Sequence, residues 1–123
     1  MENRPVVAVV DDDESVRESL PDLLSELGFA SRTFSSASDF LVSDCLEQAN
    51  CLILDIAMPG MTGLDLQREL NVRGRTLPII FITARKDDCL RPKVIEQGAV
   101  ECLYKPFSDS ALLQALNLAL RAN

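Results

Sequence analysis

Short apolar runs alternate with amphipathic segments along the whole chain. Runs rich in valine, isoleucine, leucine and phenylalanine have the length and composition of strands, and they occupy residues 5–10, 29–34, 51–55, 77–83 and 100–104. Most of these runs are apolar at successive positions, whereas a strand with one solvent-facing side alternates apolar and polar residues. The pattern therefore predicts a parallel sheet that is buried on both faces.

The segments between these runs have apolar residues at helical spacing. The first helix is expected within residues 13–28, where Gly28 gives a stop signal and the apolar positions are Val16, Leu20, Leu23, Leu24 and Leu27. Pro21 lies inside this pattern and predicts a local bend. Four further helices are expected from Ser36 or Ser38 to about Leu46, over 62–74, from about Arg91 to Gly98, and from Ser108 onward.

Strict alternation of strands and helices limits the possible topologies. Successive parallel strands are joined by right-handed crossovers. The simplest arrangement of five such strands and five helices is a doubly wound α/β sheet in the order 2-1-3-4-5. A chain of 123 residues has the size of one domain, and it contains no internal repeat or linker. We therefore expect residues 1–123 to form a single domain.

Polar residues close four of the apolar strands. Asp11 and Asp12 follow the first strand, Asp55 ends the third, Thr83 ends the fourth and Lys105 follows the fifth. In the order 2-1-3-4-5 the first and third strands are neighbours, and ligands of such folds bind at the carboxyl edge beside them. These five side chains are therefore expected to converge on one rim of the sheet.

Three neighbouring carboxylates at that rim predict a divalent cation. Acids that lie close together raise one another's pKa unless a cation sits among them. Oxygen-only ligands suit Mg²⁺, with Mn²⁺ as the alternative. Zinc is disfavoured, because the chain has no histidine and no CxxC spacing. The four cysteines are expected to be reduced thiols: Cys45, Cys51, Cys89 and Cys102.

Composition argues against several classes of function. A net charge of −7 disfavours a nucleic-acid surface, which needs a basic patch. No apolar run has the length of a membrane-spanning helix, and the first residues lack the pattern of a signal peptide, so a cytoplasmic location is expected. Because the chain has no histidine, any histidine in the mechanism must come from a partner.

A cation held by carboxylates, with one carboxylate free to attack, makes a phosphoryl acceptor. Asp55 is the expected nucleophile because it stands alone on its strand, whereas the Asp11–Asp12 pair is suited to holding the metal. Attack on a phosphohistidine or a small phosphodonor would give an aspartyl phosphate. Mg²⁺ and the Lys105 ammonium would stabilise the charge of the transferred group, and the Thr83 hydroxyl would donate to it.

Four motifs resemble those of one known family. The pieces "VVDDDE" (9–14), "LDIAMPGMTG" (54–63), "IIFITA" (79–84) and "YKPF" (104–107) have the order and spacing of response-regulator receiver domains. The resemblance covers essentially the whole chain and implies a CheY-like, flavodoxin-like fold. It implies that Asp11 and Asp12 form an acidic pocket, that Asp55 is phosphorylated, and that Thr83 and Lys105 contact the phosphoryl group.

The resemblance implies further features of the same site. The backbone carbonyl of Ala57 would be a metal ligand, and the Lys105–Pro106 peptide would be cis. Receiver domains usually carry Phe or Tyr three residues before the lysine, and here that position is Cys102, with Tyr104 the nearest aromatic residue. The residues of the conformational switch would then be Thr83, Cys102 and Tyr104.

Partners are implied by a finer resemblance. The pieces "DDDESVRESL" (11–20), "SASDFL" (36–41) and "GAVECLYKPF" (98–107) look most like the FixJ-type group of two-component transcriptional regulators. A sensor histidine kinase would supply the phosphoryl group. Phosphorylation would then alter the face formed by the fourth helix, the fifth strand and the last helix. That face would control homodimerisation or a DNA-binding output domain.

The resemblance also implies limits on the activity. A receiver domain of this kind catalyses only its own phosphorylation and dephosphorylation. In the family, the positions of Ala57 and Arg85 tune the lifetime of the aspartyl phosphate. Any output domain is expected to lie outside these 123 residues, after Asn123.

Two alternative functions fit parts of the sequence. A haloacid-dehalogenase-like phosphatase would use Asp11 as nucleophile and Asp13 as acid, with the acids at 87–88 imitating a later motif, but only Asp109 follows Lys105. A receiver-like module that binds a partner without phosphorylation is favoured by the missing aromatic residue. Phosphate on Asp55 would exclude the binding module, and phosphate on Asp11 would favour the phosphatase.

Overall fold

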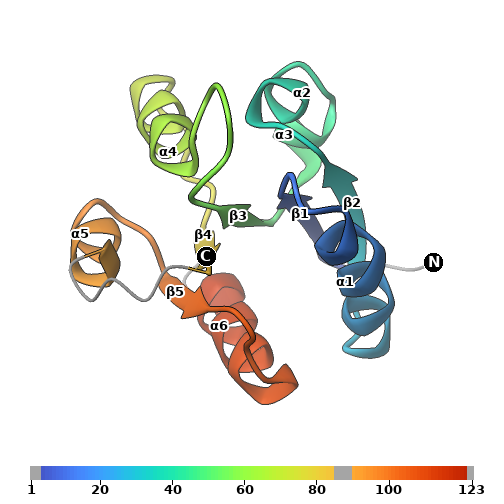
Figure 1. Ribbon diagram of the computed structural model, residues 1–123. Coiled ribbons are helices and arrows are strands. Elements are labelled where there is room, and N and C mark those ends of the chain that lie inside the picture. The colour runs from blue at the N-terminus through green and yellow to red at the C-terminus, as the bar shows by residue number, and fades with distance from the viewer. Residues whose placement is uncertain (1–3, 85–89, 122–123) are drawn as a thin grey trace.

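The computed structural model describes residues 4–84 and 90–121, and its centre is a five-stranded sheet. The strands are all parallel and lie in the order β2-β1-β3-β4-β5 (Figure 1). Their bounds are β1 Val6–Val10, β2 Ala30–Phe34, β3 Cys51–Asp55, β4 Ile79–Thr83 and β5 Glu101–Tyr104. The predicted doubly wound α/β fold and its strand order are confirmed.

Six helices pack on the two faces of this sheet in the described part of the chain. Their bounds are α1 Glu14–Glu26, α2 Ala37–Leu41, α3 Cys45–Gln48, α4 Gly63–Val72, α5 Leu90–Glu96 and α6 Asp109–Arg121. Figure 1 shows α1 and α6 on one side of the sheet and the other four on the opposite side. Both faces are therefore covered, as the continuously apolar strands require.

Two hydrophobic cores result from this arrangement. On the α1 and α6 side, Leu24 and Leu116 are fully buried against inward-facing residues of β1, β3 and β4. On the other side, Phe40, Leu66 and Val94 pack against Ala8, Val10, Leu52, Leu54 and Phe81. The central strands β1, β3 and β4 are thus buried on both faces, and polar residues follow or end them at the carboxyl edge of the sheet.

One predicted helix is split in the structure. The sequence pattern indicates a single helix from Ser36 or Ser38 to about Leu46, whereas the chain forms two short helices, α2 and α3. The break follows Leu41, and the hydroxyl of Ser43 donates a 2.8 Å hydrogen bond to the carbonyl oxygen of Phe40. A serine that bonds to the backbone in this way competes with helix continuation. Residues 4–84 and 90–121 therefore form six helices, where the sequence pattern predicts five.

The remaining helix signals agree with the structure at their ends. Ser36 caps α2 and Thr62 caps α4, where Thr62 and Asp65 form a reciprocal capping box. Ser108 accepts a hydrogen bond from the Ala111 amide at the start of α6. Pro21 lies inside α1, which continues from Glu14 to Glu26 in spite of it.

No helix in residues 4–84 or 90–121 is long and apolar enough to cross a membrane.

Candidate functional site

The acidic residues predicted at the strand ends lie together. Asp11 is fully buried directly after β1, Asp55 ends β3 with 5% of its surface exposed, and Asp12 is exposed beside them. One carboxylate oxygen from each of the three lies within 4.8 Å of the others. Because β1 and β3 are hydrogen-bonded neighbours, the sheet order itself brings these side chains together.

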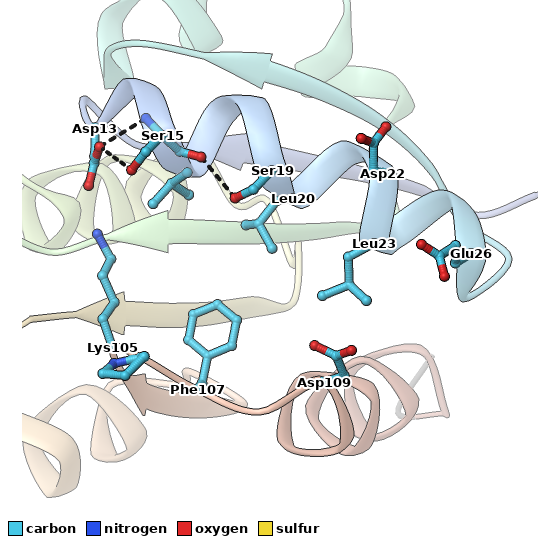
Figure 2. Close-up of a pocket in the computed structure, with 12 residues that line it drawn as sticks. Asp13, Ser15, Ser19, Leu20, Asp22, Leu23, Glu26, Lys105, Phe107 and Asp109 are labelled. Atoms are coloured by element: carbon cyan, nitrogen blue, oxygen red, sulfur yellow. Dashed lines mark hydrogen bonds between the residues drawn. The ribbon is translucent and has the colours of Figure 1, made fainter.

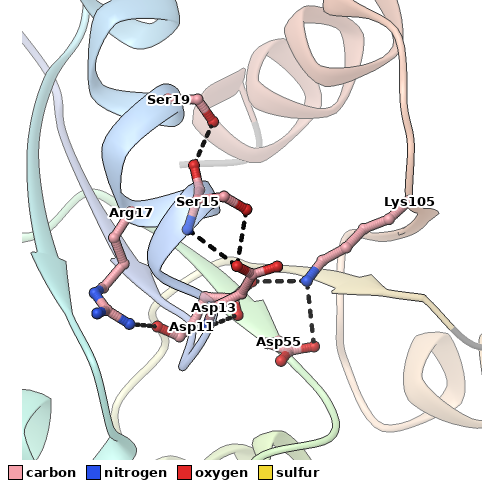
Figure 3. A network of polar contacts seen from close by, with 7 residues as sticks. All are labelled: Asp11, Asp13, Ser15, Arg17, Ser19, Asp55 and Lys105. Atoms are coloured by element: carbon pink, nitrogen blue, oxygen red, sulfur yellow. Dashed lines mark hydrogen bonds and ion pairs between the residues drawn. The ribbon is translucent and has the colours of Figure 1, made fainter.

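The loop between β1 and α1 is held by a network centred on Asp11. The Asp13 amide donates to Oδ1 of Asp11 at 2.9 Å, and Nη1 of Arg17 donates to the Asp11 backbone carbonyl at 2.9 Å (Figure 3). Asp13 in turn caps α1, since its Oδ1 accepts from the amide and the hydroxyl of Ser15. The loop residues therefore have defined positions before any ligand arrives.

A close backbone contact determines where Asp55 lies. A Cβ atom built on Gly63 would be 2.3 Å from the Asp55 carbonyl oxygen and 2.9 Å from the Cα atom of Ile56. The Gly63 amide also donates to the Ile56 carbonyl at 3.0 Å. The first turn of α4 thus rests directly on the end of β3, which only glycine permits. Sequence reasoning missed this residue, although "TG" before a helical pattern was the available signal.

Lys105 reaches the acidic cluster from the end of β5. Its Nζ atom donates to Oδ2 of Asp11 at 3.0 Å and lies 4.0 Å from Oδ1 of Asp55 (Figure 3). The Lys105–Pro106 peptide bond is cis. The lysine is therefore paired mainly with Asp11 rather than with Asp55.

The electrostatics of Asp55 differ from those of an ordinary carboxyl. The pKa of Asp55 is raised to about 7, with burial as the largest cause; the charge of Asp11 also raises it, and the Lys105 ammonium lowers it. By contrast, hydrogen bonds from the hydroxyl and amide of Ser15 lower the pKa of Asp13. Burial beside a second acid disfavours the ionised form of Asp55, and added positive charge would favour that form.

A divalent cation beside these carboxylates would supply positive charge and so favour the ionised form of Asp55. The donor set consists of three carboxylates, and oxygen donors suit Mg²⁺ and Mn²⁺ rather than softer metals. Ala57, whose backbone carbonyl was expected to be a further ligand, is an exposed residue two positions after Asp55. The three carboxylates therefore suit the Mg²⁺ or Mn²⁺ ion that the sequence predicts.

The predicted switch residues lie on β4 and β5. Thr83 is fully buried at the end of β4 and is the register partner of Tyr104, which is half-buried. Cys102 is buried in the core on the α2 to α5 side of the sheet and pairs in register with Phe81. By strand alternation Cys102 and Tyr104 face the same side. The expected lifetime-tuning residue Arg85, the acids at 87–88 and Cys89 lie outside the described residues.

A groove runs from the acidic site between α1 and the start of α6. It encloses about 580 Å³, and Lys105 lies at one end of it (Figure 2). Its apolar lining consists of Val16, Leu20, Leu23, Pro106 and Phe107, and its acidic lining of Asp13, Asp22, Glu26 and Asp109. Lys105 is the only basic residue that lines it among those described.

Comparison with known proteins identifies a family. The profile of the response regulator receiver domain matches residues 7–117. The chain is 43% identical over 121 residues to the transcriptional regulatory protein TdiR of Thauera aromatica, covering 98% of this chain and 53% of TdiR. It is 40% identical over 114 residues to FixJ of Azorhizobium caulinodans, covering 93% of this chain and 54% of FixJ. The chain spans about half the length of the curated relatives it matches.

Solved structures show the same similarity. The N-terminal fragment FixJ-N is 32% identical, with a TM-score of 0.87 over 98% of this chain and 97% of the fragment. The response regulator StyR is 47% identical, with a TM-score of 0.89 over 98% of this chain and 61% of StyR. The similarity therefore extends over both the sequence and the arrangement of the sheet and helices.

Proposed function

This chain belongs to the response regulator receiver domain family, and on that basis we propose that Asp55 accepts a phosphoryl group from a sensor histidine kinase. The observation that carries the proposal is the convergence of Asp11, Asp12 and Asp55 within 4.8 Å at the carboxyl edge of the sheet, with Lys105 beside them. We assign Mg²⁺ or Mn²⁺ to the three carboxylates.

The choice of Asp55 as nucleophile rests on what the other carboxylates already do. Both oxygens of Asp11 accept hydrogen bonds, one from the Asp13 amide and one from Lys105. Asp12 is exposed and is suited to binding a hydrated cation. Asp55 ends β3, and its Oδ1 lies 4.0 Å from Nζ of Lys105, which is beyond hydrogen-bonding distance.

The reaction is a transfer between a phosphohistidine and a carboxylate. An Asp55 oxygen attacks phosphorus, the P–N bond to the partner's imidazole breaks, and the imidazole leaves with its electron pair and takes up a proton. Bound Mg²⁺ supplies charge stabilisation for the transferred oxygens. Lys105 moves from Asp11 to a phosphoryl oxygen, and the Thr83 hydroxyl donates to another. Attack of water on the acyl phosphate later restores Asp55, so the domain catalyses only its own phosphorylation and dephosphorylation.

The acidic groove indicates the chemistry of the phosphodonor. We propose that the kinase presents an amphipathic helix whose apolar side chains cover Leu20, Leu23 and Phe107 while basic residues pair with Asp22, Glu26 and Asp109. Such a helix would bring its phosphohistidine to the Lys105 end of the groove, beside Asp55.

The response to phosphorylation involves a second surface, formed by α5, β5 and α6. Phosphorylation adds about two negative charges at the rim and draws Thr83 and Lys105 toward the phosphoryl group. This shifts the face formed by α5, β5 and α6, where Ile95 and Leu118 are exposed apolar residues that suit homodimerisation. The switch includes Cys102 and Tyr104 on β5. TdiR is named a transcriptional regulatory protein and is about twice as long as this chain, which supports a DNA-binding output domain outside residues 1–123.

Neither alternative function is supported by the site. A phosphatase with Asp13 as acid would need that carboxylate to face the nucleophile, whereas Asp13 caps α1 through Ser15. The family match also favours the receiver over the phosphatase. In a module that only binds a partner, a buried Asp55 with a raised pKa would have no role.

Intact mass after incubation with acetyl phosphate and Mg²⁺ tests the proposal. We expect a phosphoryl adduct in the wild type that is absent from Asp55→Asn, and Asp11→Asn should retain the acceptor but form the adduct more slowly. Asp44→Asn, an exposed acid between α2 and α3, is the matched control and should behave as wild type. An adduct that persists in Asp55→Asn and disappears in Asp11→Asn would instead favour the phosphatase.

A missing wild-type adduct also has a defined interpretation. A short-lived acyl phosphate and a binding-only module would both give no adduct, and beryllofluoride separates them. Binding of beryllofluoride that depends on Asp55 would support rapid hydrolysis, and failure to bind it would overturn the phosphoacceptor function.

A further inference from the structure

The peptide group between Asp11 and Asp12 lies just beyond the end of the β1–β2 ladder. The Asp11 amide donates to the carbonyl of Phe34 at 3.1 Å, and Phe34 is the last residue of β2. No further residue of β2 follows to donate to the Asp11 carbonyl. A buried carbonyl without a hydrogen-bond donor is unfavourable, so its partner must come from elsewhere.

Arg17 supplies that partner. Its Nη1 atom donates to the Asp11 carbonyl oxygen at 2.9 Å from a half-buried position in α1 (Figure 3). The acceptor is a neutral backbone oxygen, which distinguishes this contact from the surface ion pairs of Arg68 with Asp65 and of Arg73 with Glu69. The arginine therefore acts on the backbone of the loop and not on a carboxylate.

We propose that Arg17 is a positioning residue for the cation site, a role that rests on the proposed function of the acidic cluster. A peptide group is planar, so holding its carbonyl restricts the ψ angle of Asp11 and the φ angle of Asp12. Those two angles set the directions in which both side chains leave the backbone. Arg17 thus helps to orient two of the three carboxylates of the cluster through its hydrogen bond to the backbone.

The other contacts of the loop support this role. The Asp13 amide holds Oδ1 of Asp11, and Asp13 is itself fixed as the N-cap of the helix that carries Arg17. Arg17 closes this loop into one unit, because its guanidinium returns from α1 to Asp11, the residue that follows β1. Partners behind metal ligands commonly change metal affinity by about 10–100-fold when they are removed.

Manganese binding by the unphosphorylated protein tests the proposal without any phosphodonor. Free Mn²⁺ is measured by electron paramagnetic resonance during titration of wild type, Arg17→Met and Arg17→Lys. We expect Arg17→Met to weaken Mn²⁺ binding roughly tenfold. Arg17→Lys keeps one charged donor and should recover most of the affinity. Arg73→Met removes the same charge from an exposed ion pair and should stay within twofold of the wild type.

A compensated variant separates positioning from charge. Removing the Arg17 cation also makes the surroundings more acidic, which by itself favours cation binding and opposes the expected loss. Arg17→Met combined with Glu18→Gln restores the net charge on α1. If the hydrogen bond from Arg17 to the Asp11 carbonyl positions the site, the Mn²⁺ affinity of this double variant stays low. Hydrogen exchange of the amides of residues 12 and 13 in metal-free Arg17→Met should also be faster than in wild type.

Three results would overturn the proposal. The first is an Arg17→Met variant that unfolds at the wild-type urea concentration and binds Mn²⁺ within twofold of the wild type. The second is full recovery of affinity in the Glu18→Gln double variant. The third is an Arg17→Lys variant as weak as Arg17→Met. Acetyl phosphate labelling of Asp55 in the Arg17 variants at saturating Mg²⁺ keeps this outcome separate from failure of the proposed function.

Discussion

Asp55 shows how neighbours change the chemistry of a single residue. Burial and the nearby Asp11 raise the pKa of Asp55 to about 7, against an ordinary value of 3.8. The unfolded chain therefore ionises Asp55 at lower pH than the folded, metal-free domain does. The stability contributed by this group is present below pH 4 and is lost as the pH rises through 7.

Asp55→Asn should therefore stabilise the metal-free domain at neutral pH. The substitution removes a buried charge that is repelled by its neighbours, and we expect the free energy of unfolding at pH 8 to rise by about 2 kcal/mol. Urea unfolding at pH 3.5, 6 and 8 checks this, and the advantage should shrink toward pH 3.5. Mg²⁺ should stabilise the wild type more than the variant. An equal advantage at all three pH values, or none at pH 8, would contradict the raised pKa.

At the scale of the elements, strand ends and helix starts are coupled by backbone contacts. The end of β3 carries Asp55, and the start of α4 carries Gly63, whose Cα approaches the Asp55 carbonyl so closely that no side chain fits between them. The Thr62–Asp65 capping box holds the same turn of α4 in place. Asp55 is therefore positioned by the helix that follows it and by the strand that contains it.

Gly63→Ala should destabilise the domain and slow phosphorylation. Elsewhere in a helix, glycine to alanine stabilises by about 0.5–1 kcal/mol. Here the added Cβ meets backbone atoms at 2.3 and 2.9 Å, which forces α4 away from β3. We expect a loss of about 2 kcal/mol in urea unfolding and a slower rate with acetyl phosphate.

Asn71→Ala, at an exposed position of the same helix, is the control and should leave both quantities near wild type. A stabilised Gly63→Ala variant would show that α4 does not rest on Asp55.

At the scale of the whole molecule, charge is distributed unevenly. The chain carries a net charge of −7, and four acids line the groove that has Lys105 at one end. An acidic surface discourages anionic partners and accelerates association with basic ones. If Asp55 is the phosphoacceptor, we expect the groove to select among protein phosphodonors and to have no effect on small ones.

Reversing the charge of the groove should reverse the partner preference. Two synthetic amphipathic helices, each with a histidine phosphorylated by phosphoramidate, carry either lysine or glutamate beside the apolar face. We expect faster phosphoryl transfer from the lysine peptide to the wild type, and from the glutamate peptide to the Asp22→Lys, Glu26→Lys variant. Intact mass gives both rates.

Glu14→Lys, Glu18→Lys makes the same charge change on α1 outside the groove and should keep the wild-type preference. All variants should react equally with acetyl phosphate. A preference that follows net charge in both double variants would contradict docking in the groove.

The fold and most of the site were predictable because their signals are local. Mostly apolar runs marked five strands, and right-handed crossovers left few sheet orders. The simplest of these placed Asp11 and Asp55 at adjacent strand ends, and the structure has that order. Capping residues such as Thr62 and Ser108 marked helix starts within a residue or two. Where one side chain could act in two local ways, prediction failed, as at Ser43, which ends α2 instead of continuing it.

The pattern of apolar and polar residues by itself determined the class of fold, the edge of the sheet that bears the site and the chemical type of its residues. Only the tertiary structure decided which atoms are in contact at that edge. Lys105 pairs with Asp11 across 94 positions of sequence, Arg17 holds a backbone carbonyl, and Gly63 lies against Asp55. The physical reason is that the periodicity of apolar residues is a local property and indicates only which face of an element is buried. Contacts of about 3 Å between elements depend on how those elements pack.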